Sequence, residues 1–169
     1  MLHPHVQLVG DTTIQGQGLV ATKTIYKGEV VSRLEPDQPM TSLEDFYAMS
    51  VEDQGKLLVH GYQCSATHIV SEQGIEKYMN HSCDPTTWWL DDDTMIARRD
   101  IQAGEEITYD YATTDVDVPL DMECECGSPA CRQRVTSKDH ADPAWQAKFG
   151  THLPQHTLAA IRRAVVVTS

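Results

Sequence analysis

The amino-acid sequence predicts a mainly β fold with short helices, an α+β fold. Two observations predict this class. Short runs that read as strands are separated by turns containing glycine or aspartate, and helical spacing of apolar residues is confined to residues 40–60 and to the stretch after residue 136. The chain has 169 residues and is 40% hydrophobic, which is ordinary for a single globular domain with a substantial core.

The N-terminal third is expected to consist of strands. Val6–Val9 alternates as a short strand does, and the runs Leu19–Ile25 and Val30–Leu34 lie on either side of a short turn. Directly before Leu19, Gly16 and Gly18 flank Gln17. Glycines allow positive φ angles and the close approach of a ligand, although a lone Gly-x-Gly is usually only a turn.

The middle of the chain combines a helical insert with further strands. Ser42 is a suitable N-cap for a first helix, and a second is expected over Val51–Val59. The strand segments expected after the insert are Tyr62–Val70 (a strand pair), Thr87–Leu90, Thr94–Arg99 and Glu106–Tyr109. Cys64 is expected to be a small buried hydrophobic residue. Of the adjacent Trp88 and Trp89, one ring is expected to face the core and the other not.

The stretch after residue 136 is expected to be helical. Asp142 followed by Pro143 is a typical helix start, and this helix should end near Gly150. A second helix is expected from Pro154, with an apolar face made of Leu158, Ile161 and Val165. We expect these helices to pack against the domain or against a partner, and to carry no chemistry of their own.

The charge balance is strongly acidic. Asp and Glu number 25 against 13 Lys and Arg, which gives a formal net charge of -12. Direct binding of nucleic acid is not expected, because it needs a basic face. An acidic surface suits a basic partner such as a lysine-rich peptide, whose approach it would steer. The alternative is that the acidity only aids solubility.

The sequence gives no sign of export or membrane insertion. No run approaches the ~18 apolar residues of a membrane-spanning helix, and residues 1–5 lack the charged start and apolar block of a signal peptide. An intracellular protein is therefore expected, without a decision between nucleus and cytoplasm. Five cysteines are an odd number in such a chain, so a disulfide framework is not expected. The sequence does not indicate an oligomeric state.

Three of the five cysteines form a cluster. Cys124 and Cys126 are separated by one residue, and Cys131 follows after four more, so three thiols fall within eight residues. In a reducing compartment such a cluster is most simply explained by a bound ion. Four thiolates around a tetrahedral Zn²⁺ make a closed structural site, whose binding energy is folding energy.

Four motifs, in this order along the chain, together resemble the SET domain and its C-terminal zinc-binding post-SET segment. They are Gly16-Gln17-Gly18, Asn80-His81-Ser82-Cys83-Asp84-Pro85, Gly104–Tyr111 and the Cys124–Cys131 cluster. The resemblance covers roughly residues 5–135 and departs from the family's pattern at Thr86, where asparagine is common. It implies a fold of several small β-sheets with a pseudoknot. It also implies a SET domain at 1–118 with an insert near 40–60 and a post-SET segment at 119–135. The remaining residues, 136–169, are the helical tail expected from the local pattern.

The resemblance also implies an activity and a set of site residues. SET domains are S-adenosylmethionine-dependent protein-lysine methyltransferases, and the cofactor would be contacted by Gly16, Gln17, Gly18, Asn80 and His81. Tyr111 stands at the catalytic tyrosine position, Tyr109 at the position that limits the number of methyl groups, and Tyr62 is a further candidate. The structural Zn²⁺ would be held by Cys83, Cys124, Cys126 and Cys131. Leu120 and Met122 are two alternatives for covering the adenine.

Methyl transfer to lysine needs a neutral amine aligned with the sulfonium. A free lysine has a pKa near ~10.4, so the site must help to remove its proton, and a tyrosine hydroxyl can orient the amine. A hydroxyl on Tyr109 would hold a water where a bulkier methylated amine would sit, which predicts mono- or dimethylation. The expected acceptor is a basic peptide or protein, with a histone tail as one candidate. Two alternatives remain: a cofactor-binding module without turnover, and an enzyme acting on a small molecule.

Overall fold

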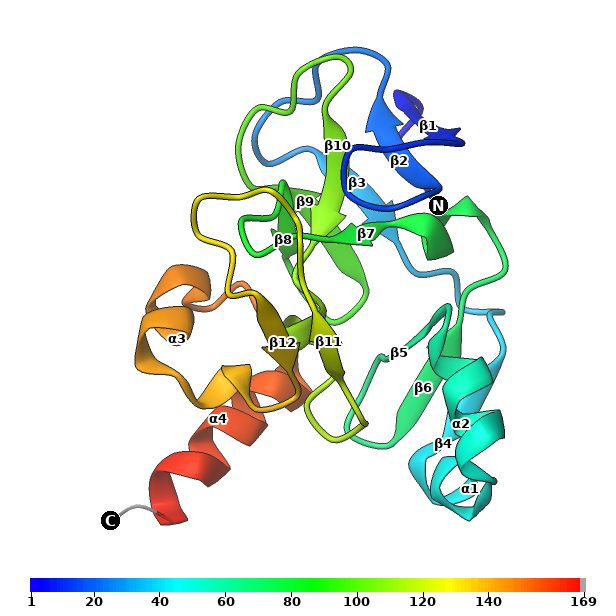
Figure 1. Ribbon diagram of the computed structural model, residues 1–169, viewed down its shortest axis with the longest axis vertical. Helices are drawn as coiled ribbons and strands as arrows, with labels where there is room; N and C mark the ends of the chain where they lie inside the picture. Colours follow the sequence, from blue (N-terminus) through cyan, green and yellow to red (C-terminus); the bar gives the residue numbers. More distant parts are fainter. Residues whose placement is uncertain (168–169) are drawn as a thin grey trace.

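The computed structural model describes residues 1–167, and side chains as far as Ala164, so the predicted contact of Val165 lies outside the described residues. Within this range, short strands form four small sheets, and the α-helices lie in two pairs on opposite sides of the lower half of the molecule (Figure 1). The fold class is therefore confirmed. No helix in the described range is long and apolar enough to cross a bilayer.

The first sheet brings two of the motifs together. Its strand order is β1 (Val6–Val9), β2 (Gly18–Ala21), β10 (Glu106–Tyr109) and β7 (Asn80–His81). β7 and β10 run parallel, with Asn80 opposite Thr108 and His81 opposite Tyr109 (Figure 1). Residues about thirty positions apart therefore lie side by side. The predicted run Leu19–Ile25 is wrong in its second half, since β2 ends at Ala21 and Ile25 forms only an isolated bridge with Ile101.

Three smaller sheets surround the first. They are β3 (Val30–Arg33), β9 (Thr94–Ala97) and β8 (Thr87–Trp89); β4 (Met40–Ser42), β6 (His68–Ser71) and β5 (Gly61–Gln63); and the hairpin β11 (Asp121–Glu123) with β12 (Arg134–Thr136). The predicted strands in the middle of the chain are thus confirmed. Trp89 is buried, whereas Trp88 is half-exposed and stacks on the ring of His152, as the alternation along a strand requires.

The predicted helical insert is confirmed as α1 (Leu43–Ala48) and α2 (Val51–Leu58). The Ser42 hydroxyl accepts the backbone N–H of Asp45, and the Ser50 hydroxyl accepts that of Asp53, so serine caps both helices. Three single turns of 3-10 helix lie elsewhere: Ile75–Tyr78, Tyr111–Thr113 and Asp139–Ala141. The turn that begins at Tyr111 starts directly after β10.

The C-terminal tail packs against the domain, as the first of the two expectations has it. α3 (Pro143–Phe149) begins after the Asp142 cap and ends at Gly150, whose φ is 56°. α4 (Gln155–Val167) follows. Trp145, Phe149 and Leu153 share one core with Cys83, Ala112, Cys124 and Val135. The tail and the cysteine segment are therefore parts of the same packed unit.

Thr86, the departure from the family's pattern, has a clear structural role. Its hydroxyl accepts the backbone N–H of Thr108 at 2.9 Å, and its own backbone N–H reaches the Thr108 hydroxyl at 3.1 Å. Both residues are buried. This reciprocal pair attaches the loop after Pro85 to strand β10, so the substitution keeps the two motifs in register.

Candidate active site

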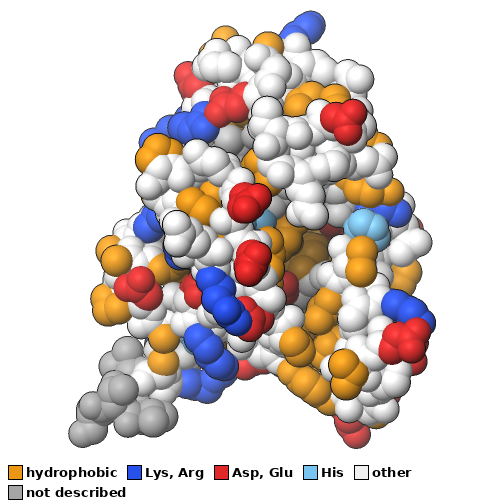
Figure 2. Space-filling view, in the orientation of Figure 1, with side chains coloured by type: hydrophobic (Ala, Val, Ile, Leu, Met, Phe, Trp, Pro, Cys, Tyr) orange, Lys and Arg blue, Asp and Glu red, His pale blue; other side chains and the backbone are white. Residues whose placement is uncertain are grey.

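Two cavities meet at Tyr111. The first, of about 400 Å³, is bordered by Ile14, Gln15, Asn80, His81, Tyr111 and Met122, and we call it the Asn80 cavity. The second, of about 170 Å³, includes Tyr62, Glu72, Met79, Tyr109, Tyr111 and Asp115 in its wall, and we call it the Tyr62 cavity. Tyr111 and Met122 belong to both walls. Figure 2 shows that this face of the molecule is hollowed at its centre and lined there by hydrophobic side chains.

The glycine loop is held against Asn80. The Asn80 amide nitrogen lies 3.1 Å from the carbonyl oxygens of both Gln15 and Gln17, and 2.8 Å from Glu106 Oε1. A Cβ on Gly18 would lie 2.8 Å from that amide nitrogen, so only glycine permits this approach, and Gly16 has a φ of 47°.

Gly16, Gln17 and Gly18 are not among the residues that border the Asn80 cavity; Ile14 and Gln15, from the same loop, are. The glycines therefore shape the loop, and their contact with a cofactor stays a prediction. Reasoning from sequence missed Ile14 and Gln15, which no local pattern distinguishes from ordinary turn residues.

His81 joins the two motifs through its ring. The ring is 3% exposed, and its Nδ1 accepts the backbone N–H of Tyr111 at 3.2 Å. Its Nε2 lies 3.4 Å from the Cys83 sulfur. Burial lowers the pKa of His81 to about 4, although the neighbouring Asp110 works in the opposite direction. The ring is therefore neutral at physiological pH, with Nε2 carrying the proton toward sulfur.

The three tyrosines predicted from the sequence lie together around the Tyr62 cavity. The rings of Tyr109 and Tyr111 are 4.8 Å apart, and those of Tyr62 and Tyr109 are 6.3 Å apart. The Tyr111 hydroxyl donates to the carbonyl oxygen of Met79 at 3.0 Å. In the part of the chain that the structure describes, the hydroxyls of Tyr62 and Tyr109 have no hydrogen-bond partner, and neither is a sealed buried atom. Both are available to a molecule in the cavity.

Burial raises the pKa of all three phenols above its ordinary value. The carboxylates of Asp115 and Glu72 add to this shift for Tyr62 and Tyr109. All three hydroxyls therefore keep their protons at neutral pH. They can orient and hydrogen-bond an amine, but they are poor bases.

The Tyr62 cavity also has acidic residues in its wall, and sequence reasoning missed them. Burial raises the pKa of Asp115 to about 7, and its carboxylate accepts the Gln63 N–H at 2.8 Å. Burial, with the nearby charge of Glu76, raises the pKa of Glu72 to about 7. Glu72 has no ion pair or hydrogen bond to its side chain within residues 1–164. Each carboxylate follows a strand or turn without a repeating pattern, so only the fold reveals that they converge.

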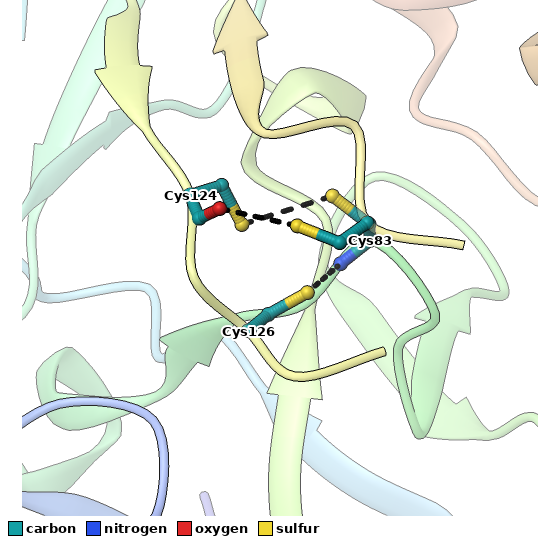
Figure 3. Close-up of side chains that lie close together, drawn as sticks. Cys83, Cys124 and Cys126 are labelled. Carbon is teal, nitrogen blue, oxygen red and sulfur yellow. Dashed lines mark hydrogen bonds between the residues drawn. The ribbon is translucent and has the colours of Figure 1, made fainter. Parts of the chain in front are cut away.

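The four cysteines predicted as ligands lie together. Their sulfur atoms are all within 4.8 Å of one another, and those of Cys83 and Cys124 are 3.8 Å apart. A tetrahedral Zn²⁺ with Zn–S bonds of about 2.3 Å places its ligands about 3.8 Å apart, so this donor set fits the ion. Figure 3 shows Cys83, Cys124 and Cys126 pointing toward a common centre.

Backbone N–H groups surround these sulfurs. The backbone N–H of Arg132 donates to the Cys83 sulfur, that of Cys83 to the Cys126 sulfur and that of Gln133 to the Cys131 sulfur, at 3.3–3.4 Å. Burial alone would raise the pKa of Cys126, but its N–H donors outweigh that effect and lower it to about 7. Such donors stabilise thiolates and orient metal ligands. Cys64 lies outside the cluster, is buried, and has a pKa that burial raises to about 11, as expected for a packing residue.

A buried carboxylate connects the cysteine segment with the tyrosines. Asp110 stands between Tyr109 and Tyr111, and its side chain is 0% exposed. It accepts two hydrogen bonds from the Arg132 guanidinium, at 2.7 and 2.8 Å, and one from the backbone N–H of Ala112 at 3.1 Å. The first residue after the last cysteine is therefore fixed to the residue between the two tyrosines.

Comparison with known proteins agrees with this architecture. The family model described as the SET domain matches residues 16–112, more than half of the chain, and the protein belongs to the SET-domain family. Those residues include Gly16–Gly18, β7 and β10, and therefore Asn80, His81 and all three tyrosines. The match leaves out Ile14, Gln15 and Met122 of the cavity walls and ends before Cys124.

Among curated proteins, the chain is 30% identical over 158 residues to histone-lysine N-methyltransferase ASHH3 of Arabidopsis thaliana, covering 85% of this chain and 42% of that protein. It is 30% identical over 135 residues to histone-lysine N-methyltransferase ash1 of Drosophila melanogaster, covering 73% of this chain and 6% of that protein. The chain thus spans less than half the length of these relatives.

Among solved structures, KRYPTONITE in complex with mCHG DNA and SAH is similar with a TM-score of 0.59. The likeness has 17% sequence identity and covers 79% of this chain and 29% of that one. At this identity the likeness concerns the fold.

Proposed function

We propose that the protein is an S-adenosylmethionine-dependent protein-lysine N-methyltransferase. One observation carries the proposal: Tyr111 is a shared wall of two cavities, each with a different chemistry. We assign the cofactor to the Asn80 cavity, where bound S-adenosylmethionine would supply a methyl group on a sulfonium. We assign the acceptor lysine to the Tyr62 cavity. This assignment is supported by family membership and by SAH in the similar structure.

The junction of the cavities suits transfer of a positively charged methyl group. The Tyr111 hydroxyl oxygen and the Met79 carbonyl oxygen lie 3.0 Å apart there, and both carry partial negative charge. Oxygen atoms fixed in this way stabilise positive charge without reorganising during the reaction. Because the pKa of Tyr111 is raised by burial, its hydroxyl positions the amine and does not remove its proton.

The Tyr62 cavity favours a cationic acceptor. Glu72 and Asp115 contribute carboxyl groups to its wall, and the unpaired hydroxyls of Tyr62 and Tyr109 can accept hydrogen bonds from an amine. Attraction to an ammonium would lower the pKa of both carboxyl groups on binding. With the net charge of -12, this supports a basic peptide or protein as substrate. The relatives' names make a histone the first candidate, and we place the protein inside the cell.

Tyr109 supports addition of one or two methyl groups. Its hydroxyl has no partner in the described chain, and the cavity is narrow, at about 170 Å³. A water held on that hydroxyl would occupy the space that a third methyl group needs. We also assign Met122, rather than Leu120, to cover the cofactor's adenine. Met122 borders the Asn80 cavity, in which we place the cofactor, whereas Leu120 borders only the Tyr62 cavity.

The test is transfer of a labelled methyl group from S-adenosylmethionine to core histones and to a whole-cell protein extract. We expect Tyr111→Phe to lower the rate about 100-fold, the size of effect for loss of one fixed polar group that stabilises the transition state. Tyr26→Phe is the matched control, since Tyr26 is 61% exposed and borders neither cavity.

Equal labelling by wild type and Tyr111→Phe would contradict the assignment of Tyr111. No labelling of either protein pool, with cofactor binding intact in calorimetry, would instead favour one of the two alternatives, a small-molecule acceptor or a non-catalytic module. Mass spectrometry of any labelled band identifies the substrate and the lysine.

A further inference from the structure

Helix α3 of the tail does not border either cavity, but it contacts Asp110 and Cys83, which lie next to cavity residues in the sequence or the fold. Two side chains, one turn apart on the helix, make these contacts: Trp145 and Lys148. Neither residue is part of the Asn80 or the Tyr62 cavity wall. The tail also lies beyond the residues that the family model matches. Their polar contacts therefore need an explanation other than contact with substrate.

Trp145 completes the hydrogen bonding of Asp110. The indole N–H donates to Asp110 Oδ2 at 3.1 Å, and the indole itself is 4% exposed. Arg132 and the Ala112 N–H supply the other donors to this carboxylate. A fully buried carboxylate that loses a donor is left with an oxygen that is less well bonded, which favours a shift of its side chain. Because Asp110 is also the N-cap of the turn that begins at Tyr111, such a shift moves the start of that turn.

Lys148 contacts the loop that follows His81, a residue of the Asn80 cavity wall. Its ammonium group donates to the carbonyl oxygen of Cys83 and lies 3.6 Å from the carboxylate of Asp84. Cys83 follows His81 by two residues, and its sulfur is 3.4 Å from the His81 ring. The lysine thereby fixes the loop that supplies both a zinc ligand and a cavity residue. Its side chain is 23% exposed and that of Asp84 is 48% exposed, so the bond to the carbonyl of the buried Cys83 is the better shielded of the two contacts.

We propose that Trp145 and Lys148 are positioning residues: helix α3 sets the shape of the Asn80 cavity by fixing Asp110 next to Tyr111 and the backbone of Cys83 next to His81. The tail is then a working part of the methyl-transfer site. This inference rests on the proposed cofactor cavity and is independent of which acceptor the enzyme methylates.

The first test compares the full-length variants Trp145→Phe and Phe149→Leu. Both remove volume from the same core, and the two rings are 4.7 Å apart, but only the first removes a donor to Asp110. We expect Trp145→Phe to weaken S-adenosylmethionine binding in calorimetry by about tenfold, the equivalent of one hydrogen bond to a charged group. Phe149→Leu should keep the wild-type Kd despite a similar loss of thermal stability.

Equal Kd values for Trp145→Phe and wild type, or an equal loss in Phe149→Leu, would overturn the role of Trp145. Because this comparison needs a protein that binds S-adenosylmethionine, a second measurement avoids the cofactor. We expect Lys148→Met to release Zn²⁺ to a chelator about tenfold faster than wild type, because it loses one charge-assisted hydrogen bond, and Lys148→Arg to restore most of the retention. Release at the wild-type rate by Lys148→Met would overturn the role of Lys148.

Discussion

Three consecutive residues, Tyr109, Asp110 and Tyr111, connect different parts of the site. Tyr109 and Tyr111 border the Tyr62 cavity, while Asp110 between them reaches Arg132 and Trp145 on the other side. Side chains that alternate at the end of a strand produce this division. The sequence could predict the two tyrosines from their motif. It could not predict that Asp110 meets Arg132 and Trp145, because they lie more than twenty residues further on and local patterns do not show which segments meet in the fold.

Replacement of Tyr109 should change the number of methyl groups transferred. We expect Tyr109→Phe to form more of the trimethylated product, because the variant cannot hold a water where the third methyl group would lie. Mass spectrometry of a peptide identified as substrate measures the product ratio. The same ratio in Tyr109→Phe and wild type would show that another residue limits methylation, and Tyr26→Phe serves as the neutral control.

The buried Asp115 makes stability depend on pH. Its pKa is raised by burial to about 7, against about 3.9 in an unfolded chain. Between these values the folded protein holds a proton that the unfolded chain has released, so this stabilising contribution is complete below pH ~4 and is lost as pH rises through 7.

The asparagine side chain of the Asp115→Asn variant cannot ionise, so the variant should not lose stability through this group as the pH rises. Relative to wild type, its free energy of unfolding should increase by a few kcal/mol as the pH rises from about 4 to about 7, and then stay constant. Urea unfolding at several pH values measures the difference, with the exposed Asp37→Asn as control. A difference that does not change with pH would show that Asp115 is ionised in the folded protein.

At the scale of elements, the cysteine segment was the most predictable part of the site. The spacing of Cys124, Cys126 and Cys131 indicates a metal, and the motif around Cys83 supplies the fourth thiol. Caps also predicted α1 and α3 correctly, because each cap is a local hydrogen bond. The end of β2 was not predictable, because Thr22, Thr24 and Ile25 suit a strand, whereas the pairing of β2 with β1 ends at Ala21.

Removal of zinc should loosen the whole cysteine segment. We expect Cys131→Ser, or treatment with a strong chelator, to lower Tm by roughly 10 °C or more, because metal binding energy is folding energy. Scanning calorimetry measures Tm, and metal analysis measures the zinc content. Cys64→Ser is the matched control, since the Cys64 sulfur donates to the His68 carbonyl, a contact that serine can replace. An unchanged Tm after complete metal removal would contradict a structural role for the ion.

At the scale of the whole molecule, the division into SET domain, post-SET segment and tail stays a prediction, and residues of all three parts pack together. Cys83 from the first part, Cys124 from the second and Trp145 from the third share one core. Local patterns indicate elements, but only tertiary contacts show which elements share a core. The division therefore remains a description of the chain, and we propose one cooperative unit.

A chain that ends at residue 136 should not form a stable SET domain. The truncation exposes the apolar surface that Trp145, Phe149 and Leu153 cover, and it removes a donor from the buried Asp110. We expect residues 1–169 to unfold in a single transition, and the truncated chain to be aggregated or largely unfolded in circular dichroism. Two separate transitions in the full chain would contradict one cooperative unit.

The parallel pairing of β7 with β10 has a consequence for how the protein is made. During synthesis, Asn80 and His81 emerge before the strand that pairs with them, and before Cys131 and Trp145. Until then β7 lacks its partner strand, and unpaired strand edges make incomplete chains prone to aggregation. On the proposed function, we therefore expect the active site to form only after most of the sequence has left the ribosome, and a chain released early to be inert.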